Sequence, residues 1–298
     1  MSNNNHLAGI LILAFLVPGT SRALPTERVA RAEPQPETLS EGEKIFILGN
    51  TQFILLHELG HAFIHDLDVP LLGREEDAAD TFATILMLRQ DRRNPDSEED
   101  FLKMLFSAAE AWALSWQKEQ QEDAELAFWN RHAISAQRFY NMACFIYGSD
   151  PEKFAAIPDL VKLPPGRADW CEEEFQVASR SLNRLFGTWM NRIHTSDDDP
   201  RSSIAVDYGV PETPLSRQLR DLFREERILE KNAEFFQTVL FLPRNFTIKF
   251  NTCGFPGAGW DNEEREVVLC YEFMEVYREL ARNRLLEKEK EFKEFLEP

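Results

Sequence analysis

The stretch QFILLHELGHAFIHDL, residues 52 to 67, carries three histidines spaced by four: His57, His61 and His65. Apolar residues fill most of the positions between them and recur at intervals of three and four, which predicts a helix in apolar surroundings. Residues four apart share one face of a helix, about 6 Å apart along its axis. The fold must therefore bury this helix and still provide polar partners for its imidazoles.

His57, Glu58 and His61 form the HExxH arrangement of zinc peptidases. Two imidazoles one turn apart can bind a single zinc ion at about 2.0–2.1 Å, and Glu58 can reach a metal-bound water as general base without binding the metal. His65 lies about 12 Å from His57 along the axis, so we interpret it as a surface histidine near the helix end. The alternative is a purely structural helical domain in which hydrogen bonds satisfy the histidines.

A catalytic zinc needs a third protein ligand. The next acids follow a turn at Pro70–Gly73, in a segment that predicts a second helix packed antiparallel to the first through small alanines. Glu76 and Asp80 share a face of it, so one can bind the metal while the other orients a ligand imidazole. Composition does not choose among the four candidates, Glu75, Glu76, Asp77 and Asp80.

Net charge excludes two classes of partner. The formal charge of the chain is -18 at pH 7, and no Lys/Arg cluster interleaved with aromatic residues occurs in it. Nucleic acid and anionic membrane surfaces both require a basic face, so neither is expected as a partner.

The N-terminal residues predict export. An apolar run from Leu7 to Val17 is followed by small residues before Leu24, which suits a signal peptide of residues 1–23 cleaved after Ala23. The run is too short to span a bilayer, and no later stretch is long and apolar enough for a transmembrane helix. We therefore expect a secreted or periplasmic protein.

Cysteine usage agrees with export. The four cysteines are Cys144, Cys171, Cys253 and Cys270, and none belongs to a CxxC pair. Of the three pairings that four cysteines allow, the sequential one, Cys144–Cys171 and Cys253–Cys270, closes the shortest loops. Four buried free thiols in a cytosolic protein are the alternative.

The pattern along the chain predicts a mainly α protein of α+β character. A flexible lead-in (24–44) precedes a helical region (45–193), which includes a helix over 125–148. A connecting loop (194–216) then leads to a C-terminal lobe (217–298) that packs on the same domain. This lobe is predicted to contain one long helix over 219–241, a β-hairpin of 246–253 with 265–273, and a charged helix from Tyr277.

The segment HELGHAFIHDLDVPLLGREEDAADTFATILML resembles a bacterial family described as metallopeptidases of unknown function. The resemblance extends to QRFYNMACFIYGSDPE, RADWCEEEF and the CG…VVLCYE segment. More distantly, the chain is similar to ImmA/IrrE-type zinc peptidases, in which HExxH is followed by a glutamate and then by an Asn or Asp and x-Phe-Ala. This second resemblance falls on Glu76, Asp80, Phe82 and Ala83, and it selects Glu76 as third ligand, with Asp80 orienting a ligand from outside the metal sphere.

The resemblance implies a zincin-like helical domain and a zinc-dependent peptidase acting on peptide or protein substrates. Zinc is bound by His57, His61 and Glu76, and Glu58 moves the proton of the attacking water. His132 and Tyr140 are candidate donors to the oxyanion. The alternative function is a catalytically inactive zinc-binding module in the export compartment.

Overall fold

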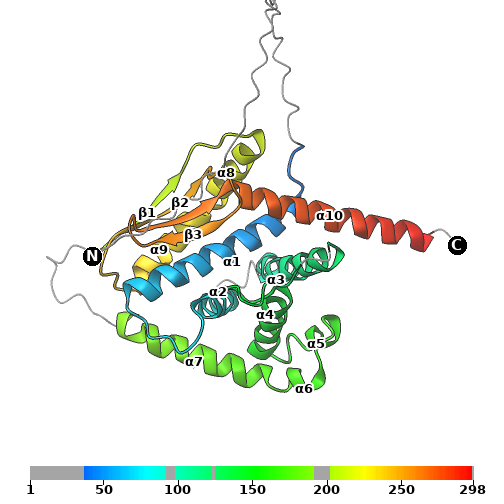
Figure 1. Ribbon diagram of the computed structural model, residues 1–298, viewed down its shortest axis with the longest axis horizontal. Coiled ribbons are helices and arrows are strands. Elements are labelled where there is room, and N and C mark those ends of the chain that lie inside the picture. The colour runs from blue at the N-terminus through cyan, green and yellow to red at the C-terminus, as the bar shows by residue number, and fades with distance from the viewer. Residues whose placement is uncertain (1–36, 92–97, 123–124, 191–201, 297–298) are drawn as a thin grey trace, which may run out of the picture. The chain divides into compact units, whose positions relative to one another are not determined.

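Helix α1 (Glu41–Asp66) packs against helices on one side and the sheet on another (Figure 1). The computed structural model describes residues 37–91, 98–122, 125–190 and 202–296, so the predicted signal peptide lies outside the described residues. The helix begins at a capping box in which the Ser40 hydroxyl accepts a hydrogen bond from the Glu43 N–H, while the Glu43 carboxylate accepts one from the Ser40 N–H. It therefore starts inside the segment predicted as a flexible lead-in.

The other helices follow in chain order. They are α2 (Glu75–Asp91), α3 (Glu98–Gln121), α4 (Ser135–Ser149), α5 (Ile157–Leu160), α6 (Pro165–Ala168), α7 (Cys171–Met190), α8 (Pro214–Glu226), α9 (Ile228–Val239) and α10 (Tyr271–Leu296). The strands are β1 (Ile204–Tyr208), β2 (Phe246–Asn251), β3 (Ala258–Asp261) and β4 (Glu266–Cys270).

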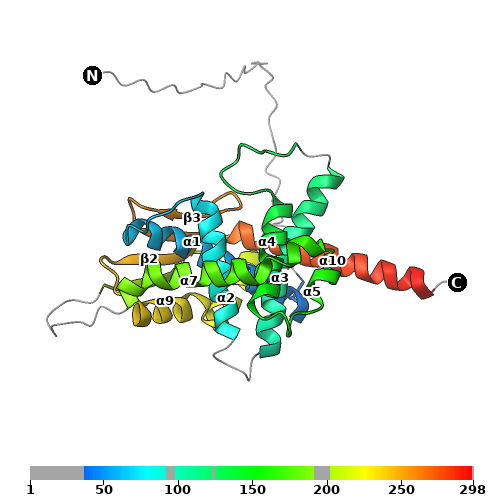
Figure 2. The same cartoon turned by 90° about the horizontal axis from the view of Figure 1, so that it is seen from below.

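Every residue of α1 from Phe46 to Phe63 is buried. A helix that is apolar on all sides has to be covered on all sides, and α1 contacts α2, α3 and α10 as well as β3 and β4 (Figure 1). Seen from below, α7 runs across α2, which it contacts (Figure 2). His57 and His61 consequently lie inside the protein.

The four strands form one sheet in the order β1-β2-β4-β3. β1 pairs with β2 and β2 pairs with β4 in parallel, whereas β3 and β4 are antiparallel. Alternate residues of β2, namely Phe246, Ile248 and Phe250, are buried, as expected for a strand with one face on the core. Together with the helices, this small sheet confirms the predicted fold class, mainly α with α+β character.

The strand pairing predicted for the C-terminal lobe is wrong. Residues 246–253 and 265–273 do not form an antiparallel hairpin, because β2 and β4 are parallel neighbours. The antiparallel partner of β4 is β3, which lies in the Gly-rich segment predicted as a turn. Alternation shows which face a strand buries, but it does not identify the neighbouring strand or its direction. β1 likewise lies inside the segment 194–216, which was predicted as a connecting loop.

Two helix predictions also need correction. The predicted helix over 219–241 is divided into α8 and α9 at Arg227, which has the left-handed φ of 53°. The change of direction lets α8 pack on α10 while α9 packs on β1 and β2. The helix predicted over 125–148 begins only at Ser135, since turns at Phe128 and Asn130 precede it.

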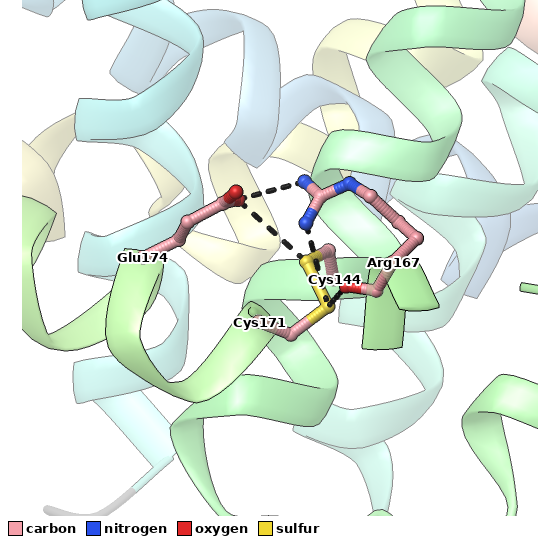
Figure 3. The surroundings of a disulfide bond; sticks show 4 residues. All are labelled: Cys144, Arg167, Cys171 and Glu174. Atoms are coloured by element: carbon pink, nitrogen blue, oxygen red, sulfur yellow. Dashed lines mark hydrogen bonds and ion pairs between the residues drawn. A yellow bond between two sulfur atoms is a disulfide. The ribbon is translucent and has the colours of Figure 1, made fainter. Parts of the chain in front are cut away.

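Both disulfides have the predicted sequential pairing. Cys144–Cys171 joins α4 to α7, and Arg167 donates a hydrogen bond of 2.7 Å to Glu174 beside it (Figure 3). The two helices approach so closely that a Cβ on Gly148 would lie 2.1 Å from the Cys171 carbonyl oxygen, so only glycine fits there. Cys253–Cys270 joins the chain just after β2 to the end of β4, which the parallel pairing places side by side.

Most buried apolar side chains of the described residues form one cluster, which extends from α1 and α2 to the sheet and α10. A smaller cluster surrounds Cys144, Leu163 and Cys171. Among the described residues, no helix has both the length and the apolar composition needed to cross a membrane.

Candidate metal centre

His57 and His61 lie on the face of α1 that meets α2. Both are buried, and their Nε2 atoms are 3.1 Å apart. The two helices can approach closely because position 60 is a glycine, where a Cβ would lie 3.3 Å from the Cα of Ala79. The spacing of the histidines and the small residues of the second helix thus place the predicted groups together.

The third donor of the centre is Glu76, in the first turn of α2. Its Oε2 atom lies 3.3 Å from His57 Nε2 and 3.2 Å from His61 Nε2. The ligand atoms of His57, His61 and Glu76 all lie within 4.8 Å of one another. Of the four acids that composition left open, Glu76 is the one that faces both Nε2 atoms.

The other ring nitrogens face carboxylates. His57 Nδ1 is 2.8 Å from Asp80 Oδ1, and His61 Nδ1 is 2.6 Å from Glu75 Oε1. An ionised carboxylate only accepts hydrogen bonds, so these contacts assign the proton of each neutral ring to Nδ1. Each Nε2 is then left with a lone pair directed toward Glu76.

These donor atoms fit a metal ion. Three ligand atoms face one another at 3.1–3.3 Å, and the buried Glu76 Oε2 accepts no hydrogen bond of good geometry, although His132 Nε2 lies 2.9 Å away. Tetrahedral zinc with bonds of about 2.0–2.1 Å separates its ligand atoms by about 3.3 Å. A buried acceptor without a donor is costly, and a cation bound between the three atoms removes that cost.

The electrostatics of the centre favour positive charge. Burial lowers the pKa of His57, but the Asp80 and Glu76 carboxylates outweigh burial and raise this pKa to about 9. Contact with the His57 imidazole lowers the pKa of Glu76 to about 2. A potential that stabilises a proton on His57 also stabilises a divalent cation.

Glu58 is buried beside the centre but is not one of the three converging donors. Burial raises the pKa of its carboxyl, while His57 and His61 lower it to a smaller extent. Among the described residues the Glu58 carboxylate makes no hydrogen bond. It is therefore free to accept a proton at the edge of the centre.

Two partners of the centre were not predicted. Arg138 binds Asp80 through two hydrogen bonds, and Glu75 accepts from His61 although it was only one of four equivalent acids. Arg138 could have been noticed, because it shares a face of α4 with the buried Met142 and Ile146, and a cation on such a face needs a buried partner. Glu75 gave no comparable signal, since acids are common in a first helical turn.

The three other residues considered in the sequence lie at different places relative to the centre. His132 lies in the segment before α4, and its Nε2 is 2.9 Å from Glu76 Oε2. Tyr140 packs against Trp116 and the small cluster at Cys144–Cys171, and no described contact joins it to the centre. His65 is half exposed, as expected of a surface residue, but its Nε2 lies 3.1 Å from Glu75 Oε1.

Comparison with known proteins identifies one family. The family model described as "Putative metallopeptidase" (DUF4344) matches residues 26–186 and 208–297, which is most of the chain and includes all three converging donors. Neither the curated proteins nor the solved structures contain a match to the chain.

Proposed function

The chain belongs to the family described as "Putative metallopeptidase", and we propose that it is a zinc-dependent peptidase. In this proposal His57, His61 and Glu76 hold the ion, and Glu58 is the general base. The observation that carries the proposal is the convergence of three potential ligand atoms beside a buried glutamate. Family membership supports a metal cofactor and a peptide substrate.

The donor set favours zinc over harder cations. Two imidazole nitrogens and one carboxylate oxygen are the ligands of many catalytic zinc sites, whereas magnesium and calcium prefer oxygen ligands alone. When bound, zinc supplies Lewis acidity, which polarises a carbonyl and makes a bound water more acidic.

The protein residues then move the protons. Glu58 accepts a proton from the attacking water and returns it to the leaving amine nitrogen. Asp80 and Glu75 hold the two imidazoles with Nε2 directed inward. Burial of Glu58 raises the pKa of its carboxyl, which brings this group closer to the pKa of an efficient base near neutral pH.

His132 is our candidate for the donor to the substrate carbonyl. It lines a cavity of about 350 Å³ that Trp112, Glu119 and Ile134 also line, and its side chain is half exposed. Burial lowers the pKa of His132, which favours a neutral imidazole. A neutral ring that retains an N–H can donate a hydrogen bond to a developing oxyanion.

We also propose that the protein acts outside the cytoplasm. Disulfides persist mainly in oxidising compartments, and the structure contains two. The predicted cleavage after Ala23 agrees with this location, although it falls outside the described residues.

Glu58→Gln tests the assignment of the base. The amide is nearly isosteric but does not accept a proton at neutral pH, so zinc stoichiometry should persist while hydrolysis of a mixed peptide library falls by about 10²–10⁴-fold. Glu43→Gln is the matched control, because Glu43 is also buried on α1 but lies about 22 Å from Glu58 along the axis. The control should retain the hydrolysis rate at equal metal content.

Each alternative gives a different result. If the zinc-loaded wild type cleaves nothing, the inactive zinc-binding module is the better assignment. If purified protein binds no metal, the histidines are structural. Equal rates for Glu58→Gln and wild type would show that Glu58 is not the base.

A further inference from the structure

Arg138 makes a two-point contact with Asp80. Its Nε donates to Asp80 Oδ2 at 2.7 Å, and its Nη2 donates to Asp80 Oδ1 at 2.5 Å. A planar guanidinium paired with a carboxylate in this way fixes the carboxylate plane as well as its position. The orientation of Asp80 is therefore set by a residue from a different helix.

The same Asp80 oxygen serves the metal centre. Oδ1 accepts from Arg138 and also lies 2.8 Å from His57 Nδ1. Rotation of the Asp80 side chain would break both contacts, so the Arg138 fork restricts the direction in which Oδ1 can meet the imidazole. The direction of His57 Nε2 follows from that restriction.

The guanidinium of Arg138 also stacks on the ring of Trp112. Its guanidinium carbon lies 3.6 Å from the centroid of the Trp112 ring, and only 9% of its side chain is exposed. Such stacking further restricts the guanidinium, and burial protects the pair from screening by salt. Helices α2, α3 and α4 thus meet at one ion pair next to the centre.

We infer that Arg138 is a positioning residue of the metal centre, acting through Asp80 to fix the His57 imidazole in its metal-binding orientation. The inference rests on the proposed function, because it takes His57 as a ligand. No described contact joins Arg138 to His57, His61 or Glu76, so its effect on the centre passes through the Asp80 carboxylate.

Metal affinity of the full chain is the decisive measurement. Competition with a chromophoric chelator for Zn²⁺ should show that Arg138→Gln weakens binding by about 10-fold, the lower end of the range for groups that orient a ligand. Arg138→Lys keeps the charge but not the fork, so it should also bind several-fold more weakly than wild type. The absorption spectrum of the Co²⁺-loaded protein should shift in both variants, since it reports ligand geometry.

Arg278→Gln is the matched control. Arg278 has the same side-chain exposure of 9% and pairs with the buried Glu43, but on α10 and away from the centre. Loss of this pair should lower the melting temperature without changing the Zn²⁺ affinity or the Co²⁺ spectrum. A general loss of stability is thereby separated from a loss of positioning.

A double variant tests whether Arg138 acts through Asp80. Arg138→Gln combined with Asp80→Asn should bind Zn²⁺ no more weakly than Asp80→Asn alone, because two changes to one chain of contacts are not additive. Additive losses would overturn the inference, as would wild-type affinity in Arg138→Lys or an equal loss in Arg278→Gln. If Zn²⁺ binds as described but no peptide is cleaved, the proposed function fails while the positioning role stands.

Discussion

The two imidazoles of the centre have carboxylate partners that differ in their surroundings. Asp80 and Glu75 lie at similar distances from Nδ1 of their histidines, 2.8 Å and 2.6 Å. Asp80 also pairs with Arg138, whose side chain is 9% exposed. Glu75 also pairs with His65, whose side chain is 46% exposed. We refer to the contacts His57–Asp80–Arg138 as the inner arm and to His61–Glu75–His65 as the outer arm.

The difference shows that equal hydrogen-bond lengths do not imply equal energetic importance. In the inner arm, removal of either charge leaves its partner buried and unpaired, which is costly. In the outer arm, water can replace a lost side chain, because exposed polar contacts contribute little. We therefore expect the inner arm to dominate the orientation of the ligands.

Removal of Glu76, which faces the histidines of both arms, should have the largest effect. Glu76→Ala takes away the proposed third ligand, so Zn²⁺ affinity should fall by more than the roughly 100-fold that marks the upper range for orienting groups. Chelator competition measures the loss. Asp77→Ala is the control, because Asp77 lies in the same turn but, within the described part of the chain, forms its ion pair with Arg74 at the surface. Equal affinities for the two variants would place the third ligand elsewhere.

The second prediction compares the arms directly. Asp80→Asn should reduce Zn²⁺ affinity by about 10–100-fold, and Glu75→Gln should reduce it by less. Both substitutions retain an acceptor oxygen, but Asp80 pairs with the buried Arg138 and Glu75 with the half-exposed His65. The same chelator assay, run at low and high salt, gives both values. Salt should reduce the effect of Glu75→Gln more strongly. A larger loss for Glu75→Gln would reverse our ranking of the arms.

Sequence reasoning identified the inner arm only in part. The four-residue spacing of the histidines and the shared face of Glu76 and Asp80 are helix periodicity, which depends on neighbours in the chain. Arg138 lies 58 positions from Asp80, so no local sequence pattern predicts their contact. Disulfide pairing was predictable because loop length ranks the possible pairs, and strand pairing was not, because alternation alone leaves partner and direction open.

The break between α8 and α9 illustrates a second limit. Arg227 is neither glycine nor proline. Four charged residues, 224–227, separate the apolar pairs 222–223 and 228–229, but Leu222 and Leu229 are still seven residues apart and so keep a helical spacing that predicts one helix. Helix α8 packs on α10 whereas α9 packs on the sheet, and the left-handed conformation of Arg227 provides the change of direction between them. Tertiary contacts of this kind override helix propensity.

The third prediction concerns the exposed end of the outer arm. His65→Asn should change Zn²⁺ affinity by no more than about 2- to 3-fold, because the contact of His65 with Glu75 is half exposed. The chelator competition assay measures this change. A loss as large as that in Glu75→Gln would mean that His65 holds the carboxylate as firmly as Arg138 holds Asp80.

The smallest effect should be the pH dependence of the inner arm in metal-free protein. Burial raises the pKa of Asp80, but His57 and Arg138 outweigh burial and hold this pKa below its ordinary value of 3.8. A carboxyl with a lowered folded-state pKa contributes stability above its unfolded pKa and loses that contribution as pH falls through the folded pKa. The free energy of unfolding of wild type minus that of Asp80→Asn should therefore be largest above about pH 5 and shrink toward pH 2. Urea unfolding in the presence of chelator measures both proteins, and carboxyls elsewhere cancel in the difference. A difference that stays constant down to pH 2 would show that the Asp80 charge is not stabilised by Arg138 and His57.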